Sequence, residues 1–592
     1  MNTPRSLAAL TLLALLPACS APGEAPPIDW QEWSEASFER ARAEDKLVLL
    51  HLGAVWCHWC HVMEHETYED PAIQRLLDEG WVAIYVDQDA RPDVSNRYEN
   101  WGWPATVVFD AERNELAKYR GYIEAEEFER RLRGFMRNPV PDDSVSAQAE
   151  LDFDADAGLG VELRADVEAR RIAGYDESEG GWGTVHKFLE RGNVEYALVR
   201  AAQGAEEEER RARAVLELAQ QLIDPVWGGA YQYSHGGVWT NPHYEKIMSY
   251  QAGYLTAYSL AYAQWGERAH RESAEAIVRY LLEFLSDPEG GFYVSQDADL
   301  VRGVKAHDFF AADDATRRGM GMPRIDKNLY ARENGWAIDA LCTYAMATGD
   351  AEALERALRA ARWVLEHRSL EGGGFAHGES DEGGPFLDDT LAMGRGFLGL
   401  YQLTGEREWL DRAEAAADFI AERFAAPDQP GFLTAQAPPG ATGVFVPLPQ
   451  FEENIELARW ANLLSAYTGA EELRALAESA MRWLSNPIVT RSRRTSLGGL
   501  LLADLELASD PLHVTVVAPA EDRSGEALFA GALRLPGWYK RVERWDPNGP
   551  QLPNPDVPLP AVARPAAFLC FDGACSSPIE DPFQLVDAVQ RR

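Results

Sequence analysis

The stretch Trp56-Cys57-His58-Trp59-Cys60-His61 decides the fold of the first part of this chain. Two cysteines separated by two residues can form a small, reversible disulfide or bind a metal ion. An apolar run typical of a buried strand, residues 46–52, precedes the pair, and a pattern that fits one continuing helix, residues 58–77, follows it. Cys57 is therefore expected at a helix N-terminus, which lowers the pKa of a thiol and favours its thiolate.

Further elements complete the pattern of a thioredoxin-like domain. Strands are predicted at residues 81–86, 105–109 and 115–120, with a final amphipathic helix at 123–137. In thioredoxin-like domains a cis-proline faces the CxxC pair, and Pro104 lies directly before the third predicted strand. The sequence therefore predicts a thioredoxin-like domain over residues 29–140.

The residues around the pair have expected roles in thiol–disulfide exchange. Cys57 is the predicted nucleophile and Cys60 the resolving thiol. Pro104, with Trp103 before it, is expected to shape the surface that accepts the substrate. The intervening His58 and Trp59 are expected to tune the reduction potential and to contact the substrate, since a protonated imidazole favours a thiolate.

No metal or other cofactor is expected beyond the reversible Cys57-Cys60 disulfide, but the CxxC spacing leaves one alternative. Structural zinc sites combine cysteines with histidines at short spacings, and His51, His61 and His65 could complete a Cys/His tetrad. The alternative is therefore a structural zinc site.

The N-terminus predicts export. Residues 1–18 combine one basic residue with an apolar stretch too short to span a bilayer, as in a secretory signal peptide. Cys19 follows a small residue, as in a bacterial lipobox, and is the expected lipidation site, with residues 19–28 as a tether. The alternative is an ordinary signal peptide cleaved nearby. The predicted location is therefore the bacterial outer membrane, as a lipoprotein, or the periplasm, with membrane contact through the lipid anchor alone.

Charge and cysteine content narrow the function classes. The 592-residue chain has a formal net charge of −39, which argues against nucleic acid or anionic membrane as a partner for a basic face. An exported protein keeps its disulfides, and Cys570 and Cys575 are close enough in sequence to bridge, although sequence alone leaves this open. Cys342, within an apolar helical run, is expected to be a buried core thiol.

Residues 155–510 carry an internal repeat. Glycine-rich turns followed by a bulky apolar residue occur at 180–182, 228–231, 290–292, 373–375, 430–432 and 498–500. Pairs of amphipathic helices run between them, so each hairpin is expected to bury its apolar face against its neighbours. Six such hairpins predict an (α/α)6 toroid, with an open helical solenoid as the alternative. Residues 511–592 are predicted to form a small α/β appendage.

Unusual polar and aromatic residues gather in two loops of the predicted toroid. Aromatic rings and carboxylates together suit a saccharide, because rings stack on the sugar while carboxylates bind hydroxyls or move protons. His243 and Glu245 are the candidates for proton transfer, and either glycoside hydrolysis by paired carboxylates or epimerisation by a histidine base would fit. The candidate saccharide-binding or metal-contacting residues are Tyr231, Tyr244, Asp297 and Asp299.

Two acidic pairs open later predicted helices, Asp388-Asp389 and Glu452-Glu453. Carboxylates at a helix start bind free N–H groups and suit the helix dipole. Helix capping is therefore the preferred explanation of both pairs.

Several long motifs resemble one known family. Residues 56–70 (WCHWCHVMEHETYED), 241–246 (NPHYEK) and 290–299 (GGFYVSQDAD) are similar to those of the spermatogenesis-associated protein 20 family of large thioredoxin-domain proteins. The resemblance covers most of the chain after the signal peptide. It implies a thioredoxin-like domain followed by a toroid similar to six-hairpin glycosidases and N-acylglucosamine 2-epimerases.

The combined prediction is a multidomain protein, α/β and all-α, that works as an envelope-anchored thiol–disulfide oxidoreductase. Its expected partners are protein thiols or disulfides, and its toroid is expected to bind or process a saccharide. Two alternatives remain: a sugar epimerase or glycosidase-like enzyme whose thioredoxin-like domain has no redox role, and a binding or scaffold protein.

Overall fold

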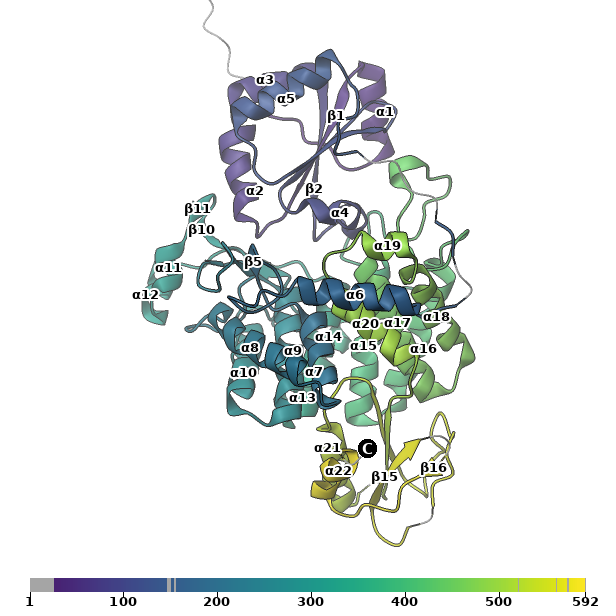
Figure 1. The fold of residues 1–592 in the computed structure, drawn as a ribbon. Helices are drawn as coiled ribbons and strands as arrows, with labels where there is room; N and C mark the ends of the chain where they lie inside the picture. Colours follow the sequence, from purple (N-terminus) through teal and green to yellow (C-terminus); the bar gives the residue numbers. More distant parts are fainter. Residues whose placement is uncertain are drawn as a thin grey trace, which may run out of the picture.

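The chain forms three parts arranged in a column, shown as a ribbon of the computed structural model in Figure 1: an α/β domain, a ring of helices and a small C-terminal α/β domain. The structure describes residues 26–145, 151–153, 156–519, 521–560, 562–571 and 574–590. The predicted signal peptide and Cys19 lie outside these residues. Among the helices described, not one combines the length and the apolar character needed to cross a bilayer.

The N-terminal domain is built on a four-stranded sheet with the order β2-β1-β3-β4. Its strands are β1 (Leu47–Gly53), β2 (Trp81–Asp87), β3 (Ala105–Phe109) and β4 (Glu115–Arg120). β1 runs parallel to β2 and antiparallel to β3, with Leu50 opposite Ile84 on one side and Val107 on the other. The predicted thioredoxin-like fold is confirmed.

The sheet is flanked by helices α1 (Glu35–Glu44), α2 (His58–Met63), α3 (Pro71–Gly80), α4 (Pro92–Tyr98) and α5 (Ala125–Arg137), with a 3₁₀ turn η2 (Glu99–Trp101). The prediction of one helix over residues 58–77 is wrong. α2 ends at Met63, a π-helical turn η1 (Glu64–Tyr68) follows, and Asp70 then caps α3 by accepting the N–H groups of Ala72 and Ile73. Proline at the first position of α3 has no N–H to continue the preceding helix, so the chain starts a new one.

The central part is a closed double ring of helices. The inner helices are α7 (Arg191–Ala202), α9 (Met248–Trp265), α13 (Ala331–Thr348), α15 (Leu387–Thr404), α17 (Phe451–Thr468) and α20 (Leu497–Leu507). The outer helices are α6 (Val161–Ala173), α8 (Glu206–Ala219), α10 (Arg268–Phe284), α14 (Ala351–His367), α16 (Arg407–Arg423) and α18 (Glu471–Leu484). Each inner helix contacts the next, and α20 returns to contact α7. This closure makes the unit an (α/α)6 toroid and excludes the open solenoid.

The first five glycine-rich segments are turns that join an outer helix to the following inner helix. The sixth prediction is wrong, because Gly498 and Gly499 lie within α20. At four turns, a polar side chain near the start of an inner helix accepts a backbone N–H of the turn. The pairs are Gln251 with Ala230, Asn334 with Phe292, Thr390 with Phe375, and Asn454 with Phe432. Position 229 requires glycine, because a Cβ there would lie 2.5 Å from the Tyr280 ring and the backbone φ is +75°.

Short elements cover the end of the toroid that faces the N-terminal domain. They are β5 (His186–Lys187), β6 (Tyr233–His235), β7 (Pro242–His243), β8 (Lys246–Ile247), β9 (Ser295–Gln296), β10 (Asp299–Val301), β11 (Val304–Lys305), β12 (Ile325–Asp326), α11 (His307–Ala311), α12 (Asp314–Met320), α19 (Pro487–Arg491), η3 (Gln220–Leu222) and η4 (Gly443–Phe445). Through β8–β11 the toroid reaches the CxxC pair.

The C-terminal domain repeats the sheet topology of the first. Its elements are β13 (Leu512–Val517), α21 (Arg523–Leu533), β14 (Lys540–Trp545), β15 (Ala566–Phe571), β16 (Ala574–Cys575) and α22 (Pro582–Gln590). The order is β14-β13-β15-β16, with β13 parallel to β14 and antiparallel to β15, as in the N-terminal sheet. No cysteine precedes α21 at the position of the CxxC pair. Cys570 and Cys575, whose pairing the sequence left open, form a disulfide. Cys342 is a free buried thiol, as predicted.

Candidate functional site

The two cysteines of the CxxC motif lie at the start of α2 and form a disulfide. Cys57 is the N-cap residue, and its sulfur accepts the N–H of Cys60 at 3.1 Å. The peptide bond between Trp103 and Pro104 is cis, and Pro104 directly precedes β3. The sequence prediction of Cys57 at a helix N-terminus is therefore confirmed.

Both cysteines are covered by the toroid. Cys57 is 3% exposed and Cys60 is 0% exposed. Ile247, at the end of β8, belongs to the same apolar cluster as the two cysteines, and Trp103 and Tyr250 pack against that cluster. The disulfide is therefore buried at the contact between the N-terminal domain and the toroid.

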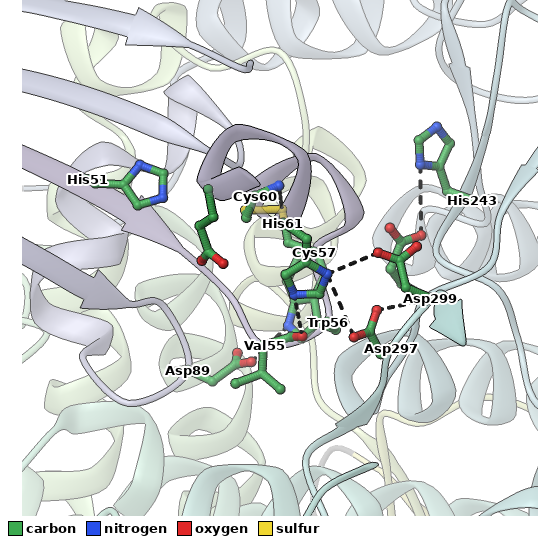
Figure 2. The surroundings of a disulfide bond; sticks show 12 residues. His51, Val55, Trp56, Cys57, Cys60, His61, Asp89, His243, Asp297 and Asp299 are labelled. Carbon is green, nitrogen blue, oxygen red and sulfur yellow. Dashed lines mark hydrogen bonds and ion pairs between the residues drawn. A yellow bond between two sulfur atoms is a disulfide. The ribbon is translucent and has the colours of Figure 1, made fainter. Parts of the chain in front are cut away.

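A histidine–aspartate network joins the CxxC helix to the toroid, as Figure 2 shows. Asp299 contacts His58 Nδ1 through Oδ1 at 2.7 Å and His61 Nδ1 through Oδ2 at 3.0 Å. Burial by itself would raise the pKa of Asp299, but its hydrogen bonds with the two histidines lower it to about 2. Burial raises the pKa of Asp297 to about 7, against the opposing effect of His61. Asp299 therefore acts as an anionic partner of the CxxC helix.

The histidines of the alternative zinc site do not gather around the cysteines. His51 Nδ1 lies 3.2 Å from the hydroxyl of Tyr68, and His65 pairs with Glu69. With the two sulfurs bonded to each other, a Cys/His zinc tetrad is not assembled in this structure.

The remaining predicted toroid residues lie beside the network or within the packed core. His243 stacks on Tyr233, and its Nδ1 is 3.8 Å from Oε2 of the buried Glu245. Tyr231 and Tyr244 pack against each other in a T-shaped pair, and the hydroxyl of Tyr244 contacts His307. Neither tyrosine lines the large cavity of the toroid.

Trp59 and Trp103, both predicted to contact substrate, have different surroundings. The Trp59 side chain is 37% exposed and lies beside Tyr122. Trp103 packs against the apolar cluster of the disulfide and also lines the toroid cavity. Trp103 therefore connects the two candidate sites.

The toroid encloses a cavity of about 540 Å³ beneath the N-terminal domain. Nine acidic and three arginine side chains line it, together with aromatic residues that include Trp56, Trp103, Trp336 and Tyr250. The acidic residues are Asp89, Glu99, Glu190, Glu333, Asp339, Asp388, Glu452, Glu453 and Glu456. The size and lining suit a small polar ligand with an apolar face.

Burial raises the pKa values of several carboxyl groups that line the cavity. Burial raises the pKa of Asp388 and of Glu190 to about 7. It also raises the pKa of Glu453, and the nearby Asp388 carboxylate raises it further. Oε2 of Glu333 and Oε2 of Glu453 have no hydrogen-bond partner among the described residues. The carboxyl groups of the cavity can therefore donate a hydrogen bond when protonated and accept one when ionised.

The prediction that the acidic pairs cap their own helices is wrong: α15 has no side-chain cap, and Gln450 caps α17. Asp388, Glu452 and Glu453 line the cavity, whereas Asp389 accepts the N–H of Arg332 near the start of the neighbouring helix α13. Their position at the start of inner helices could have indicated a shared site, because the inner helices of a toroid all begin at the same end of the ring.

The N-terminal domain closes the mouth of the cavity through direct contacts. The carboxylate of Asp89 accepts from Trp56 Nε1 at 2.8 Å, and its backbone carbonyl lies 2.6 Å from Nε2 of His377 in the toroid. Asn96 donates to Glu453 at 2.8 Å. The two contacts with the toroid join residues 288 and 357 positions apart, so the spacing of residues in the sequence does not indicate them.

Fold and site together define a class: a thioredoxin-like domain with a CxxC pair, docked on an (α/α)6 toroid. Residues 22–137 match the thioredoxin-like DsbH domain family, described as "Protein of unknown function, DUF255". The human spermatogenesis-associated protein 20 is 29% identical over 311 residues, 46% of this chain and 39% of that protein. The chain is therefore similar to spermatogenesis-associated protein 20 over about half of its length, in line with the resemblance of its motifs. It spans about two fifths of the length of the curated relatives it matches.

Other relatives and solved structures match single parts of the chain. The thiol:disulfide interchange protein DsbD of Cronobacter sakazakii is 36% identical over 103 residues, 16% of this chain and 18% of that protein. A D-mannose isomerase structure is 14% identical, covers 60% of this chain and 99% of its own, and has a TM-score of 0.46. The cellobiose 2-epimerase of Bacillus thermoamylovorans is 11% identical, with 55% and 86% coverage and a TM-score of 0.43.

Proposed function

We propose that this protein is an exported thiol–disulfide oxidoreductase whose Cys57-Cys60 pair exchanges electrons with thiols or disulfides of partner proteins. The observation that carries the proposal is the CxxC disulfide at the N-terminus of α2, with Cys57 as the N-cap residue. Similarity to a protein named for thiol–disulfide interchange supports it. Export and a lipid anchor at Cys19 belong to the proposal, since disulfides persist outside the cytosol.

The exchange follows from the positions of the two sulfurs. In the reduced protein, the Cys57 thiolate attacks one sulfur of a substrate disulfide, forms a mixed disulfide and releases the other substrate thiolate. The Cys60 thiolate then attacks the Cys57 sulfur, closes the Cys57-Cys60 bond and releases the second substrate thiolate. Two electrons pass to the substrate, and the protein ends in the oxidised state that the structure describes.

Trapping of the mixed disulfide tests this proposal. Reduced Cys60→Ala protein, mixed with glutathione disulfide, should gain one glutathionyl group at Cys57, detected by mass spectrometry. The adduct should be absent from the Cys57→Ser/Cys60→Ala double variant and present when Cys570 and Cys575 are also changed to serine. An unmodified Cys57 in folded Cys60→Ala protein would contradict the proposal.

The toroid cavity supports a second function, binding of a neutral saccharide. Trp336 contributes an aromatic ring to the lining, and Glu333 and Glu453 contribute carboxyl groups. A sugar presents an apolar ring face, which can stack on the aromatic ring. Its hydroxyl groups donate and accept hydrogen bonds, so they can bind the carboxyl groups. The aromatic and acidic lining therefore suits a sugar better than a nucleotide or another anion.

Ligand-detected NMR with D-mannose and cellobiose tests the second function. Saturation transfer to one of these sugars is expected with the wild type, and Trp336→Ala should lower the affinity by about tenfold, the loss of roughly 1.4 kcal/mol of stacking. Trp59→Ala is the matched control, because Trp59 does not line the cavity. Absence of transfer with both sugars, or equal loss in both variants, would contradict saccharide binding in this cavity.

A further inference from the structure

Three buried side chains from two domains converge beside the disulfide. They are His61 of α2 and Asp297 and Asp299 of the β9–β10 segment, and one ligating atom from each lies within 4.8 Å of the others. Each of these side chains is at most 5% exposed. None of them lines the toroid cavity, so this cluster is separate from the proposed saccharide site.

The imidazole of His61 is held in one orientation. Its Nε2 lies 3.1 Å from the carbonyl oxygen of Val55, so Nε2 carries a proton and donates it. Nδ1 therefore points at Oδ2 of Asp299, at 3.0 Å, and Oδ2 of Asp297, at 3.8 Å. A histidine whose second nitrogen donates to a backbone carbonyl is the usual arrangement of a metal ligand.

The two carboxylates are also fixed by contacts of their own. Oδ1 of Asp297 accepts the N–H of Asp299 at 2.9 Å, and Oδ2 of Asp299 accepts the N–H of Gly303 at 2.8 Å. Oδ1 of Asp299 lies 2.7 Å from His58 Nδ1. These contacts leave Oδ2 of each aspartate directed at the same imidazole nitrogen, an arrangement in which the three atoms could bind one cation.

A third carboxylate points to the same need for positive charge. Glu245 is 3% exposed, and its Oε2 has no hydrogen-bond partner among the described residues. Its Oε2 lies 3.8 Å from Nδ1 of His243, and its charge acts on the neighbouring Asp297. A buried carboxylate without hydrogen bonds is costly, and a nearby divalent ion would offset that cost.

We propose that His61, Asp297 and Asp299 bind a divalent transition metal, best fitted by zinc. Zinc bonds to imidazole nitrogen and carboxylate oxygen are about 2.0–2.2 Å long, so neighbouring ligand atoms around a tetrahedral ion lie about 3.4 Å apart. The separations of 3.0 and 3.8 Å from His61 Nδ1 bracket this value. An imidazole ligand favours zinc over magnesium or calcium.

The ion would join the two domains, because His61 belongs to the CxxC helix and both aspartates belong to the toroid. Three protein ligands leave a fourth position open, as in catalytic rather than structural zinc sites. The proposal does not depend on the redox function, since the metal ligands include neither cysteine.

Binding of zinc to the full chain with both disulfides closed tests the proposal, because closed disulfides offer no thiolate. Isothermal titration with zinc chloride is expected to give one bound ion per chain. Asp297→Asn and His61→Ala should each lower the affinity at least about tenfold, whereas His65→Ala, on the exposed turn after α2, should not. Folding of each variant is checked by circular dichroism.

Cobalt substitution gives a second measurement that does not need a variant. The cobalt-loaded wild type should show visible d–d bands of a site with nitrogen and oxygen ligands, without thiolate charge-transfer bands. Absence of zinc binding, zinc binding unchanged in folded Asp297→Asn protein, or thiolate bands in the cobalt spectrum would each overturn the proposal.

Discussion

At the scale of single residues, the motif identified the reactive pair, whereas its partners came from the fold. Cys57 and Cys60 are recognisable because they follow the strand predicted at residues 46–52, and Pro104 because it directly precedes the strand predicted at 105–109. Asp299 lies 241 positions after His58, so its contact with the CxxC helix could not be predicted from spacing. Asp297 and Asp299 were therefore predicted to contact a saccharide or a metal ion in the toroid, and not the CxxC helix.

The cavity carboxyls lead to a prediction about pH. The folded-state pKa of Asp388, about 7, lies above its unfolded value near 3.9, so between these values the folded state binds more protons. Stability therefore falls as pH rises from about 4 to 7, by about 1.4 kcal/mol for each unit of pKa difference.

Asp388→Asn removes this titration, so its melting temperature should fall less between pH 5 and pH 8 than that of the wild type. Scanning calorimetry at the two pH values checks the difference. Asp411→Asn, at an exposed site on α16, is the control and should follow the wild type. Parallel pH profiles of wild type and Asp388→Asn would show that Asp388 does not carry this dependence.

At the scale of elements, periodicity predicted helix and strand type well and helix ends less well. The strand at 105–109 and the helix pairs of the toroid agree with the structure, since their apolar patterns are long and regular. The helix predicted at 58–77 divides because Asp70 and Pro71 form a start signal for α3, which outweighs the apolar pattern. Short strands such as β8 (Lys246–Ile247) have no pattern of their own, although β8 places Ile247 over the disulfide.

Ile247 leads to a prediction about access to the sulfurs. Ile247→Ala removes part of the apolar cover of Cys57, which should make opening of the interface easier by about 1 kcal/mol. Reduced Cys57 should then react with iodoacetamide about fivefold faster than in the wild type. Ile277→Ala, equally buried in α10 and outside the cluster, should leave the rate unchanged. Equal rates in all three proteins would show that β8 does not limit access.

At the scale of the whole molecule, the sequence predicted the parts but not how they are joined. Six glycine-rich segments with helix pairs between them were enough to predict the closed toroid. The docking of the N-terminal domain on its mouth depends on single contacts such as Asn96 with Glu453, 357 positions apart. The repeated sheet topology in the C-terminal domain also went unpredicted, because its strands lack the CxxC motif that marks the first domain.

The redox equilibrium of the full chain in glutathione and dithiothreitol buffers tests the central claim most directly, with alkylation and mass spectrometry reporting the state of Cys57 and Cys60. We predict one two-electron transition between about −120 and −270 mV, the range of CxxC oxidoreductases. Cys57→Ser should lack it, and Cys570→Ser/Cys575→Ser should retain it. A Cys57-Cys60 bond that stays closed below about −300 mV, as structural disulfides do, would contradict the account.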